Sequence, residues 1–136
     1  MDRNSPIKEI MTTELVTAKA EDSVNRIRQI FDANNFHHLP VIENGNVLIG
    51  IISRQDINKV VQLLAYDAKD AKHGPMRAKD IMSKSPMLLD PEDTIGLAAD
   101  VFMTNKFHAL PIVEDDKLIG IITTHDLLSY CFSSPI

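Results

Sequence analysis

The sequence is poor in the features that mark several classes of protein. It has one cysteine, Cys131, among its 136 residues, so no disulfide can form within the chain. No apolar stretch approaches the roughly 20 residues that span a bilayer, and the first residues lack the apolar segment of a signal peptide. We therefore expect a cytoplasmic protein without a membrane partner, in which Cys131 is a small buried apolar residue.

Positive charge and catalytic motifs are also scarce. The chain has 14 Lys and Arg against 19 Asp and Glu, a net charge of −5, and no basic run. A nucleic-acid surface needs clustered positive charge, so we expect no nucleic-acid partner. The chain has neither a glycine-rich phosphate loop nor a nucleophile elbow, and its five histidines lack the spacing of metal ligands. We therefore expect no catalytic residues, no metal and no required cofactor.

What the sequence does contain is a duplication, in which residues 8–57 recur as residues 79–127. The hydrophobic pattern of each copy predicts the order β-α-β-β-α. We expect repeat 1 over residues 1–65, a linker over 66–77 and repeat 2 over 78–136. Each repeat alone buries too little surface to fold, so we expect an α/β fold in which the two pack together with pseudo-twofold symmetry.

Local signals predict how each repeat begins and ends its first helix. Apolar residues recur at helical spacing in both copies. Asp22 and Asp93 precede these segments and are predicted N-caps. Asn34 and Asn105 follow them and suit a left-handed residue at the helix exit. Residues 43–46, Glu-Asn-Gly-Asn, predict a hairpin turn.

A repeated motif, Gly-h-h-Ser/Thr-x-x-Asp with h apolar, carries the candidate chemistry. It pairs Ser53 with Asp56 and Thr123 with Asp126. One interpretation is structural, because a hydroxyl and a carboxylate at this spacing form a helix-capping box. The other is functional. A helix N-terminus with a hydroxyl suits a phosphate, and a carboxylate one turn later can accept both hydrogen bonds of a ribose diol.

These motifs resemble the CBS-domain family over nearly the whole chain. The resemblance rests on the opening Ile-Met, the x-Leu-Pro strand and the Gly-h-h-Ser/Thr-x-x-Asp ending, each present twice in order. It implies a tandem pair of CBS units, a Bateman module, which we expect to stand alone. Many such pairs bind AMP, ADP, ATP or S-adenosylmethionine between the repeats, and many form homodimers.

The resemblance also implies two clefts, each built from both repeats. In the family, one repeat supplies the hydroxyl and carboxylate, and the other supplies the residues that face the base. The cleft we prefer has His38 and His125 as extra phosphate donors, whereas the second has only Arg54 close by. The preferred cleft combines Val16, Phe36, His37 and His38 with Thr123, His125 and Asp126; the second combines Ser53, Gln55 and Asp56 with Met87, Phe107, His108 and Ala109.

The sequence thus predicts a non-catalytic sensor that binds an adenosine-containing nucleotide and signals to a separate effector protein. The alternative is a ligand-free dimerisation or protein-interaction module, in which both Ser/Thr-x-x-Asp motifs are helix caps only.

Overall fold

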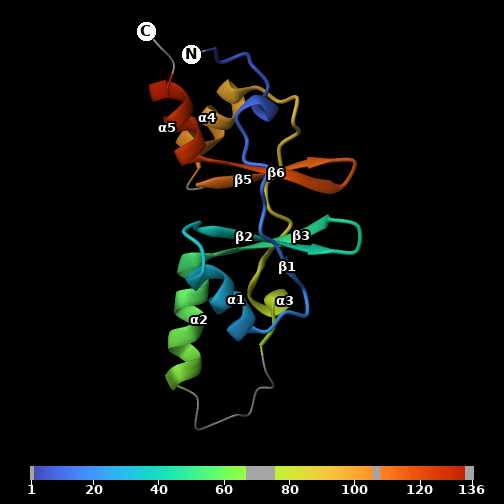
Figure 1. The fold of residues 1–136 in the computed structure, drawn as a ribbon, viewed down its shortest axis with the longest axis vertical. Helices are drawn as coiled ribbons and strands as arrows, with labels where there is room; N and C mark the ends of the chain where they lie inside the picture. Colours follow the sequence, from blue (N-terminus) through green and yellow to red (C-terminus); the bar gives the residue numbers. More distant parts are fainter. Residues whose placement is uncertain (1, 67–75, 106–107, 134–136) are drawn as a thin grey trace. The chain divides into compact units, whose positions relative to one another are not determined.

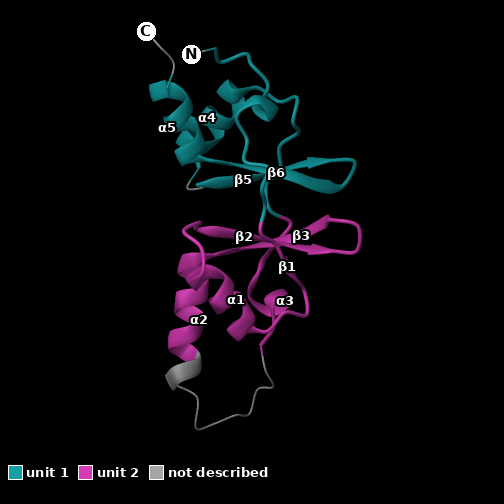
Figure 2. Ribbon diagram, viewed as in Figure 1, with its two compact units in different colours: residues 1–15, 86–136 teal, residues 16–85 magenta. Residues whose placement is uncertain are grey.

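The structure, a computed structural model, describes residues 2–66, 76–105 and 108–133 and divides into two compact units (Figures 1 and 2). Unit 1 contains residues 1–15 and 86–136, and unit 2 contains residues 16–85. These units do not follow the repeat boundaries, because the first residues of each repeat pack with the body of the other repeat. Residues 67–75, most of the predicted linker, lie outside the described residues.

Unit 2 is built around a short sheet with its helices packed against it (Figure 1). β1 runs parallel to β2, β2 and β3 form an antiparallel hairpin, and β4 pairs antiparallel with β3. The apolar stripe predicted from helical spacing is buried along α1, at Val24, Ile27, Ile30 and Phe31. The elements are β1 (Ala18–Lys19), α1 (Val24–Asp32), β2 (His38–Glu43), β3 (Val47–Ser53), α2 (Arg54–Tyr66), α3 (Ala78–Ile81) and β4 (Ser83–Lys84).

Unit 1 has the same plan. β5 and β6 form an antiparallel hairpin, Leu89 makes a parallel bridge to Ile112, and Thr12 bridges to Ile121. Its core contains Ile7, Ala98, Val101, Leu110 and Ile122 together with Leu89 and Ile112. The elements are the 3-10 helix η1 (Ile7–Glu9), α4 (Ile95–Thr104), β5 (Ala109–Glu114), β6 (Lys117–Thr123) and α5 (Thr124–Ser133). The predicted α/β class and the order β-α-β-β-α are therefore confirmed, although the first strand of repeat 2 is reduced to one bridge.

Both hairpin turns use left-handed residues. In the first turn Gly45 has φ +78° and Asn46 has φ +64°, and in the second Asp115 and Asp116 have φ of +51° and +65°. Two consecutive positive φ values match the right-handed twist of the flanking strands. The predicted turn at residues 43–46 is confirmed, and repeat 1 has one more residue in this loop than repeat 2.

The opening segment of each repeat is held by ion pairs at equivalent positions of the two units. Lys8 binds Glu92 in unit 1, and Lys79 binds Glu21 in unit 2. The hydrogen bond and the negative charge of Glu92 raise the pKa of Lys8, and those of Lys79 lower the pKa of Glu21. Because all four side chains are well exposed, these pairs orient the opening segments more than they stabilise the fold.

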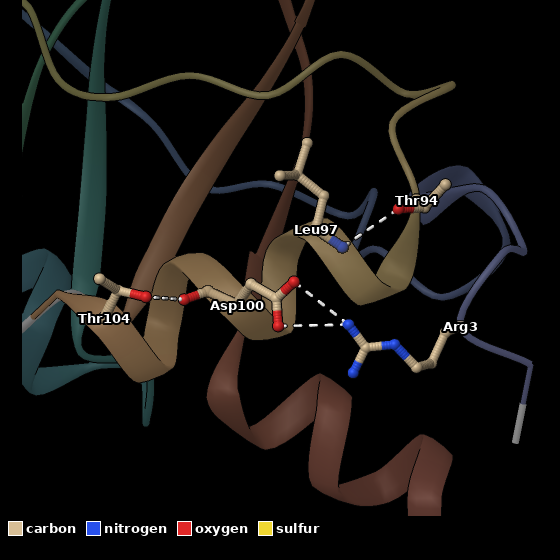
Figure 3. Close-up of polar contacts among 5 residues, drawn as sticks. All are labelled: Arg3, Thr94, Leu97, Asp100 and Thr104. Atoms are coloured by element: carbon tan, nitrogen blue, oxygen red, sulfur yellow. Dashed lines mark hydrogen bonds and ion pairs between the residues drawn. The ribbon is translucent and has the colours of Figure 1, made fainter.

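The N-terminal residues supply backbone acceptors for the first turn of α4, and the Arg3 side chain also reaches this helix (Figure 3). The amide of Ile95 donates to the carbonyl of Ser5 and that of Gly96 to the carbonyl of Arg3, both at 2.9 Å. Thr94 caps the amide of Leu97, and the Arg3 guanidinium reaches both carboxylate oxygens of Asp100 at 3.2 Å. The first three amides of α4 are thus all satisfied, which ties the opening segment to unit 1.

Two glycines of the repeated motif are required by a close approach of methionine. A Cβ added to Gly50 would lie 2.7 Å from Met82 Cγ and 3.0 Å from Met82 Cβ. A Cβ on Gly120 would lie 2.6 Å from Met11 Sδ and 3.1 Å from the carbonyl oxygen of Thr12. The methionine of the opening Ile-Met therefore packs against the glycine of the Gly-h-h-Ser/Thr motif. The contact joins the opening segment of one repeat to the last strand of the other.

This contact makes a prediction about stability. We expect Gly50→Ala to lower the free energy of unfolding by about 1–3 kcal/mol through overpacking, measured by urea denaturation. Adding Met82→Ala should relieve the clash, so the double variant should lose less than the sum of the two single variants. Gly45→Ala is the control: it is strained by its positive φ but has open space around it, so its effect should add to that of Met82→Ala. Strict additivity of Gly50→Ala and Met82→Ala would contradict the contact.

The structure corrects the predicted helix ends. The N-caps are Ser23 and Thr94, one residue later than predicted, because their hydroxyls accept the amides of the third helical residues. Asp22 and Asp93 instead accept the amides of Lys19 and Asp90 and close the preceding turns.

The asparagines at the helix exits are not left-handed. Neither Asn34 nor Asn105 has a positive φ. Their side-chain amides donate to the carbonyls of Ile30 and Val101, one turn back. Each therefore satisfies an acceptor at the C-terminal end of a helix, which a side chain can do without a left-handed backbone.

Cys131 is exposed on α5, so its predicted burial is wrong. The sequence around it is apolar, but no residue of α5 is fully buried. Within the described residues, no helix is both long enough and apolar enough to cross a bilayer.

Candidate functional site

Each repeated motif lies where the last strand of a repeat passes directly into its second helix. β3 ends at Ser53 and α2 begins at Arg54, and β6 ends at Thr123 with α5 following at once. The Ser53 hydroxyl accepts the Asp56 amide at 3.0 Å, and the Thr123 hydroxyl accepts the Asp126 amide at 3.1 Å. The capping role predicted for both hydroxyls is confirmed. The motif therefore sets a hydroxyl and a half-buried carboxylate at a helix N-terminus in each unit.

The two carboxylates differ in what they bind. Asp126 Oδ2 accepts the Thr123 amide at 2.9 Å and the Thr123 hydroxyl at 3.0 Å, which completes a capping box. Asp126 Oδ1 accepts the hydroxyl of Thr12 at 3.1 Å. In the part of the chain that the structure describes, the Asp56 carboxylate accepts no hydrogen bond. Asp56 thus keeps both oxygens available there, whereas Asp126 is engaged by its own unit.

Arg54 is not placed as a phosphate donor. Its guanidinium donates to the carbonyls of Phe31 at 2.9 Å, Asn34 at 2.8 Å and Phe36 at 2.8 Å, and lies 5.2 Å from the centre of the Phe31 ring. These acceptors are at the end of α1 and in the segment that follows it. The suggestion that Arg54 serves the second cleft is therefore corrected: its side chain fastens α1 to α2.

The other predicted residues of unit 2 lie before the hairpin, at its first residue and on α2. Val16 is 43% exposed and precedes β1, and Phe36 packs against Phe31 with ring centres 5.6 Å apart. His37 is exposed and His38 half-buried at the start of β2. The His37 carbonyl accepts the amide of Arg54 at 2.8 Å, which brings this segment to the start of α2. Gln55 is exposed on α2.

Unit 1 repeats this arrangement. The His108 carbonyl accepts the amide of Thr124 at 3.1 Å, so residues 108–109 lie at the start of α5. His108 and His125 are exposed, Ala109 is buried, and Met87 is 45% exposed. Phe107 lies outside the described residues. Each predicted cleft combines residues of both units, and that grouping stays a prediction.

Thr12 was missed by the sequence-based reasoning. It follows the opening Ile-Met, and its equivalent in repeat 2 is Ser83, so a hydroxyl stands after the motif in both copies. That repetition was a usable signal. What it did not reveal is that Thr12 contacts Asp126, because this needs the opening segment of repeat 1 to pack with repeat 2.

No cluster of three or more His, Cys, Asp or Glu side chains suited to a metal ion occurs within residues 2–66, 76–105 and 108–133. What these two sites offer is a hydroxyl, a helix N-terminus and a carboxylate. Such groups form hydrogen bonds to a polar ligand.

Comparison with known proteins agrees with this arrangement. The CBS domain profile matches residues 7–63 and 78–133. The chain is 33% identical over 115 residues to an inosine-5′-monophosphate dehydrogenase of Korarchaeum cryptofilum, covering 84% of this chain but only 22% of that enzyme. It is 28% identical to an uncharacterised protein of Methanocaldococcus jannaschii, covering 90% of this chain and 88% of that protein. The chain thus spans about a fifth of the dehydrogenase.

Solved structures share the fold. The CBS-pair protein CBSX2 of Arabidopsis thaliana, in complex with AMP, superposes with a TM-score of 0.82 at 26% identity, covering 94% of this chain and 96% of that one. The CBS domain pair of protein MJ0100, with 5′-methylthioadenosine and S-adenosylmethionine, gives a TM-score of 0.76 at 23% identity, covering 94% and 95%. The profile match over both repeats and these shared folds show that the chain belongs to the CBS-domain family, as a tandem pair of CBS repeats.

Proposed function

We propose that this chain is a non-catalytic regulatory module that binds an adenosine-containing ligand (AMP, ADP, ATP or S-adenosylmethionine) and signals to a separate effector protein in the cytoplasm. The observation that carries the proposal is the Asp56 carboxylate, half-buried beside a helix N-terminus and without a hydrogen-bond donor in the described residues. A half-buried carboxylate without a hydrogen-bond donor has lost part of its hydration and has gained no hydrogen bond in exchange, which costs free energy. A ribose diol would supply the missing donors.

The chemistry of the motif fits a nucleotide better than other small anions. The positive ends of the α2 and α5 helix dipoles favour a phosphate, whereas a carboxylate repels one. The first and third amides of each helix already donate within their own unit, so the second amide of each, that of Gln55 or His125, is the one placed to bind the phosphate. A hydroxyl at the helix N-terminus and a carboxylate one turn later therefore suit a ligand that has an anionic end for the first and a neutral diol for the second. A ribose 5′-phosphate is such a ligand. The AMP complex of CBSX2, at 26% identity, supports the same class of ligand.

We propose that the ligand contacts residues of both repeats, in the two groups predicted from the sequence. The group containing Asp126 has His38 and His125 as further donors and remains our preferred one. A diol bound to Asp126 would replace the hydrogen bond from Thr12, so binding there would loosen the opening segment of repeat 1. Binding at Asp56 would displace no hydrogen bond of the described residues. The two sites should therefore differ in how strongly they couple to the opening segments.

Regulation would then act through a shift between conformations. A ligand changes such an equilibrium only by its difference in affinity for the two states. We propose that the chain works as a homodimer and passes the change to a separate effector protein. We transfer none of the dehydrogenase chemistry to this chain, because the match covers 22% of that enzyme.

The second candidate is the ligand-free interaction module. The observation that favours it is the complete capping box at Asp126, since stability alone explains that carboxylate. It does not explain Asp56, whose carboxylate accepts no hydrogen bond from Ser53 or from any other of the described residues. The two candidates therefore differ most clearly at Asp56.

Calorimetric titration separates the two candidates. We expect one of AMP, ADP, ATP and S-adenosylmethionine to bind with micromolar affinity, and NAD serves as a larger adenosine-containing comparison. The unfolding temperature should rise with the concentration of the same ligand, as linkage requires. The absence of both heat and thermal shift with every ligand would support the interaction module and overturn the nucleotide proposal.

A further inference from the structure

The helix pair of unit 2 borders a groove lined mainly by polar side chains. The groove has a volume of about 310 Å³, at the lower end of the range of roughly 300–1,000 Å³ that small-molecule pockets occupy. All its lining residues lie on α1 and α2. The polar ones include Arg28 and Asp32 on α1 and Asn58 and Gln62 on α2. We call this feature the α1–α2 groove.

Arg28 and Asp32 bring opposite charges to the α1–α2 groove, and neither charge is paired. Both side chains are exposed, and neither forms a hydrogen bond or an ion pair with the residues that the structure describes. They lie four residues apart on one helix, about 6 Å along its axis, yet they do not bind each other. The third charged residue of the lining, Arg54, already donates to three backbone carbonyls. The groove therefore offers one available cation and one available anion.

The position of these charges is not explained by the stability of the fold. Asp32 is the last residue of α1, where the negative end of the helix dipole disfavours a carboxylate. In unit 1, the residues equivalent to Arg28, Asp32, Asn58 and Gln62 are Ala99, Met103, Leu128 and Phe132. The last three are 83%, 56% and 85% exposed, so unit 1 has an apolar surface at this place. Since one repeated element gives both surfaces, a CBS unit does not require a charged groove there.

We propose that the α1–α2 groove binds a free α-amino acid with an uncharged side chain. An α-amino acid carries an ammonium and a carboxylate on one carbon atom. Asp32 would accept hydrogen bonds from the ammonium, and the planar guanidinium of Arg28 would donate to both oxygens of the carboxylate. Such a ligand pairs both charges of the groove at once, whereas a simple anion or a simple cation would leave one of them without a partner.

The rest of the lining indicates the class of side chain that the amino acid carries. Asn58 and Gln62 lie one turn apart on α2, and neither side chain makes a hydrogen bond to the described part of the chain. Val61, half-buried on the same helix, adds apolar contact. Once the head group is bound, no charged side chain of the lining remains available, because Arg54 is engaged. A charged side chain on the ligand would therefore lack a partner.

The α1–α2 groove is separate from the candidate nucleotide sites. Neither Ser53 nor Asp56 lines it, and the other motif belongs to unit 1. The proposal therefore goes beyond the proposed function and does not rest on it. A chain with both kinds of site would receive two separate small-molecule signals.

Nuclear magnetic resonance titration of the whole, isotope-labelled chain measures this binding. We expect leucine, methionine or glutamine to bind with submillimolar affinity and to shift amide signals of α1 and α2. Arg28→Gln and Asp32→Asn should each weaken binding about 10-fold or more, the effect of losing a hydrogen bond to a charged group. Arg26→Gln is the matched control, since Arg26 is exposed on α1 but does not line the groove; it should change the affinity less than about twofold. Circular dichroism checks that each variant is folded.

Modified ligands assign each charge of the head group to its partner. The N-acetyl derivative of the amino acid that binds has no ammonium, so its weaker binding should be insensitive to Asp32→Asn but reduced by Arg28→Gln. The amine that lacks the carboxylate should show the reverse. Free glutamate and lysine should bind about 10-fold more weakly than the uncharged amino acids, because their side-chain charge has no partner in the groove.

Each outcome decides one point. The absence of signal shifts with all three uncharged amino acids would overturn the proposal. Binding that survives both Arg28→Gln and Asp32→Asn would place the amino acid elsewhere and overturn the groove as its site. Equal binding of the modified ligands would overturn the pairing of the head group, and equal binding of glutamate or lysine would overturn the class of side chain. These variants leave both candidate nucleotide sites unchanged, so the calorimetric test of nucleotide binding succeeds or fails separately.

Discussion

Asp56→Ala is expected to weaken the binding of the adenosine ligand at that site about 10- to 150-fold, the effect of losing roughly 1.5–3 kcal/mol of hydrogen bonding to a charged group. The same change should alter the free energy of unfolding by less than about 0.5 kcal/mol, because the Asp56 carboxylate accepts no hydrogen bond in the described residues. Calorimetry measures the first quantity and urea denaturation in the absence of ligand measures the second.

Asp126→Ala is the matched comparison at the equivalent position. We expect a similar loss of affinity at its own site, but also a loss of about 1–2 kcal/mol of stability. The reason is that its carboxylate accepts three hydrogen bonds, from the Thr123 amide, the Thr123 hydroxyl and the Thr12 hydroxyl. Thr12→Val removes one of them and should strengthen ligand binding at Asp126, since the diol would no longer compete with that hydroxyl.

These variants separate binding from capping. If both alanine variants lowered stability and neither changed the affinity of any ligand, the carboxylates would be helix caps only. If only Asp126→Ala abolished binding, the preferred site would be the occupied one. If only Asp56→Ala did so, the Asp56 carboxylate would be the ligand site, and the preference for Asp126 would be wrong.

Arg54→Ala is expected to lower the free energy of unfolding by about 2–3 kcal/mol, measured by urea denaturation. The change removes hydrogen bonds from a charged donor to the carbonyls of Phe31, Asn34 and Phe36 and the contact with the Phe31 ring. The end of α1 would then lose its attachment to α2. Because these donors are already engaged, the affinity for a phosphate-bearing ligand should change less than about twofold.

Two controls test the assignment of Arg54. Thr124→Ala, at the equivalent position of unit 1, should change stability by less than about 0.5 kcal/mol, since no side-chain hydrogen bond from Thr124 is found in the described residues. Arg54→Lys should recover less than half of the loss, because an ammonium cannot reach separate carbonyls with a planar fork. A large fall in nucleotide affinity with unchanged stability would contradict the structural role and restore Arg54 as a phosphate donor.

Local patterns predicted much of each unit. The helical spacing of Val24, Ile27, Ile30 and Phe31 predicted the buried side of α1 because that side follows from periodicity alone. The Glu-Asn-Gly-Asn turn predicted its hairpin because few residues tolerate positive φ. The predicted helix caps were wrong by one residue, since Asp22 and Ser23 are both good capping residues and only the backbone geometry decides between them.

Contacts between distant segments could not be predicted in this way. The motif Ser/Thr-x-x-Asp is the same in both repeats, yet Asp126 is engaged by Thr12 while Asp56 accepts no hydrogen bond from the described residues. The difference depends on a residue 114 positions away. Likewise Gly50 and Met82 are both visible as parts of motifs, but nothing in their spacing indicates that they touch. Arg54 was suggested as a phosphate donor from its position in the sequence. The groups that a long side chain contacts depend on its surroundings, which the sequence position does not give.

The sequence by itself determined the duplication, the α/β order of each repeat, the hairpin turns and the positions of the repeated hydroxyls and carboxylates. All of these are local, or follow from comparing the chain with itself. Only the tertiary structure decided that the opening segment of each repeat packs with the other, that Arg54 serves the fold, and that α4 and α5 leave an apolar surface exposed. Those features depend on which distant segments share a core within each unit, and burial of that core selects which segments pack together there.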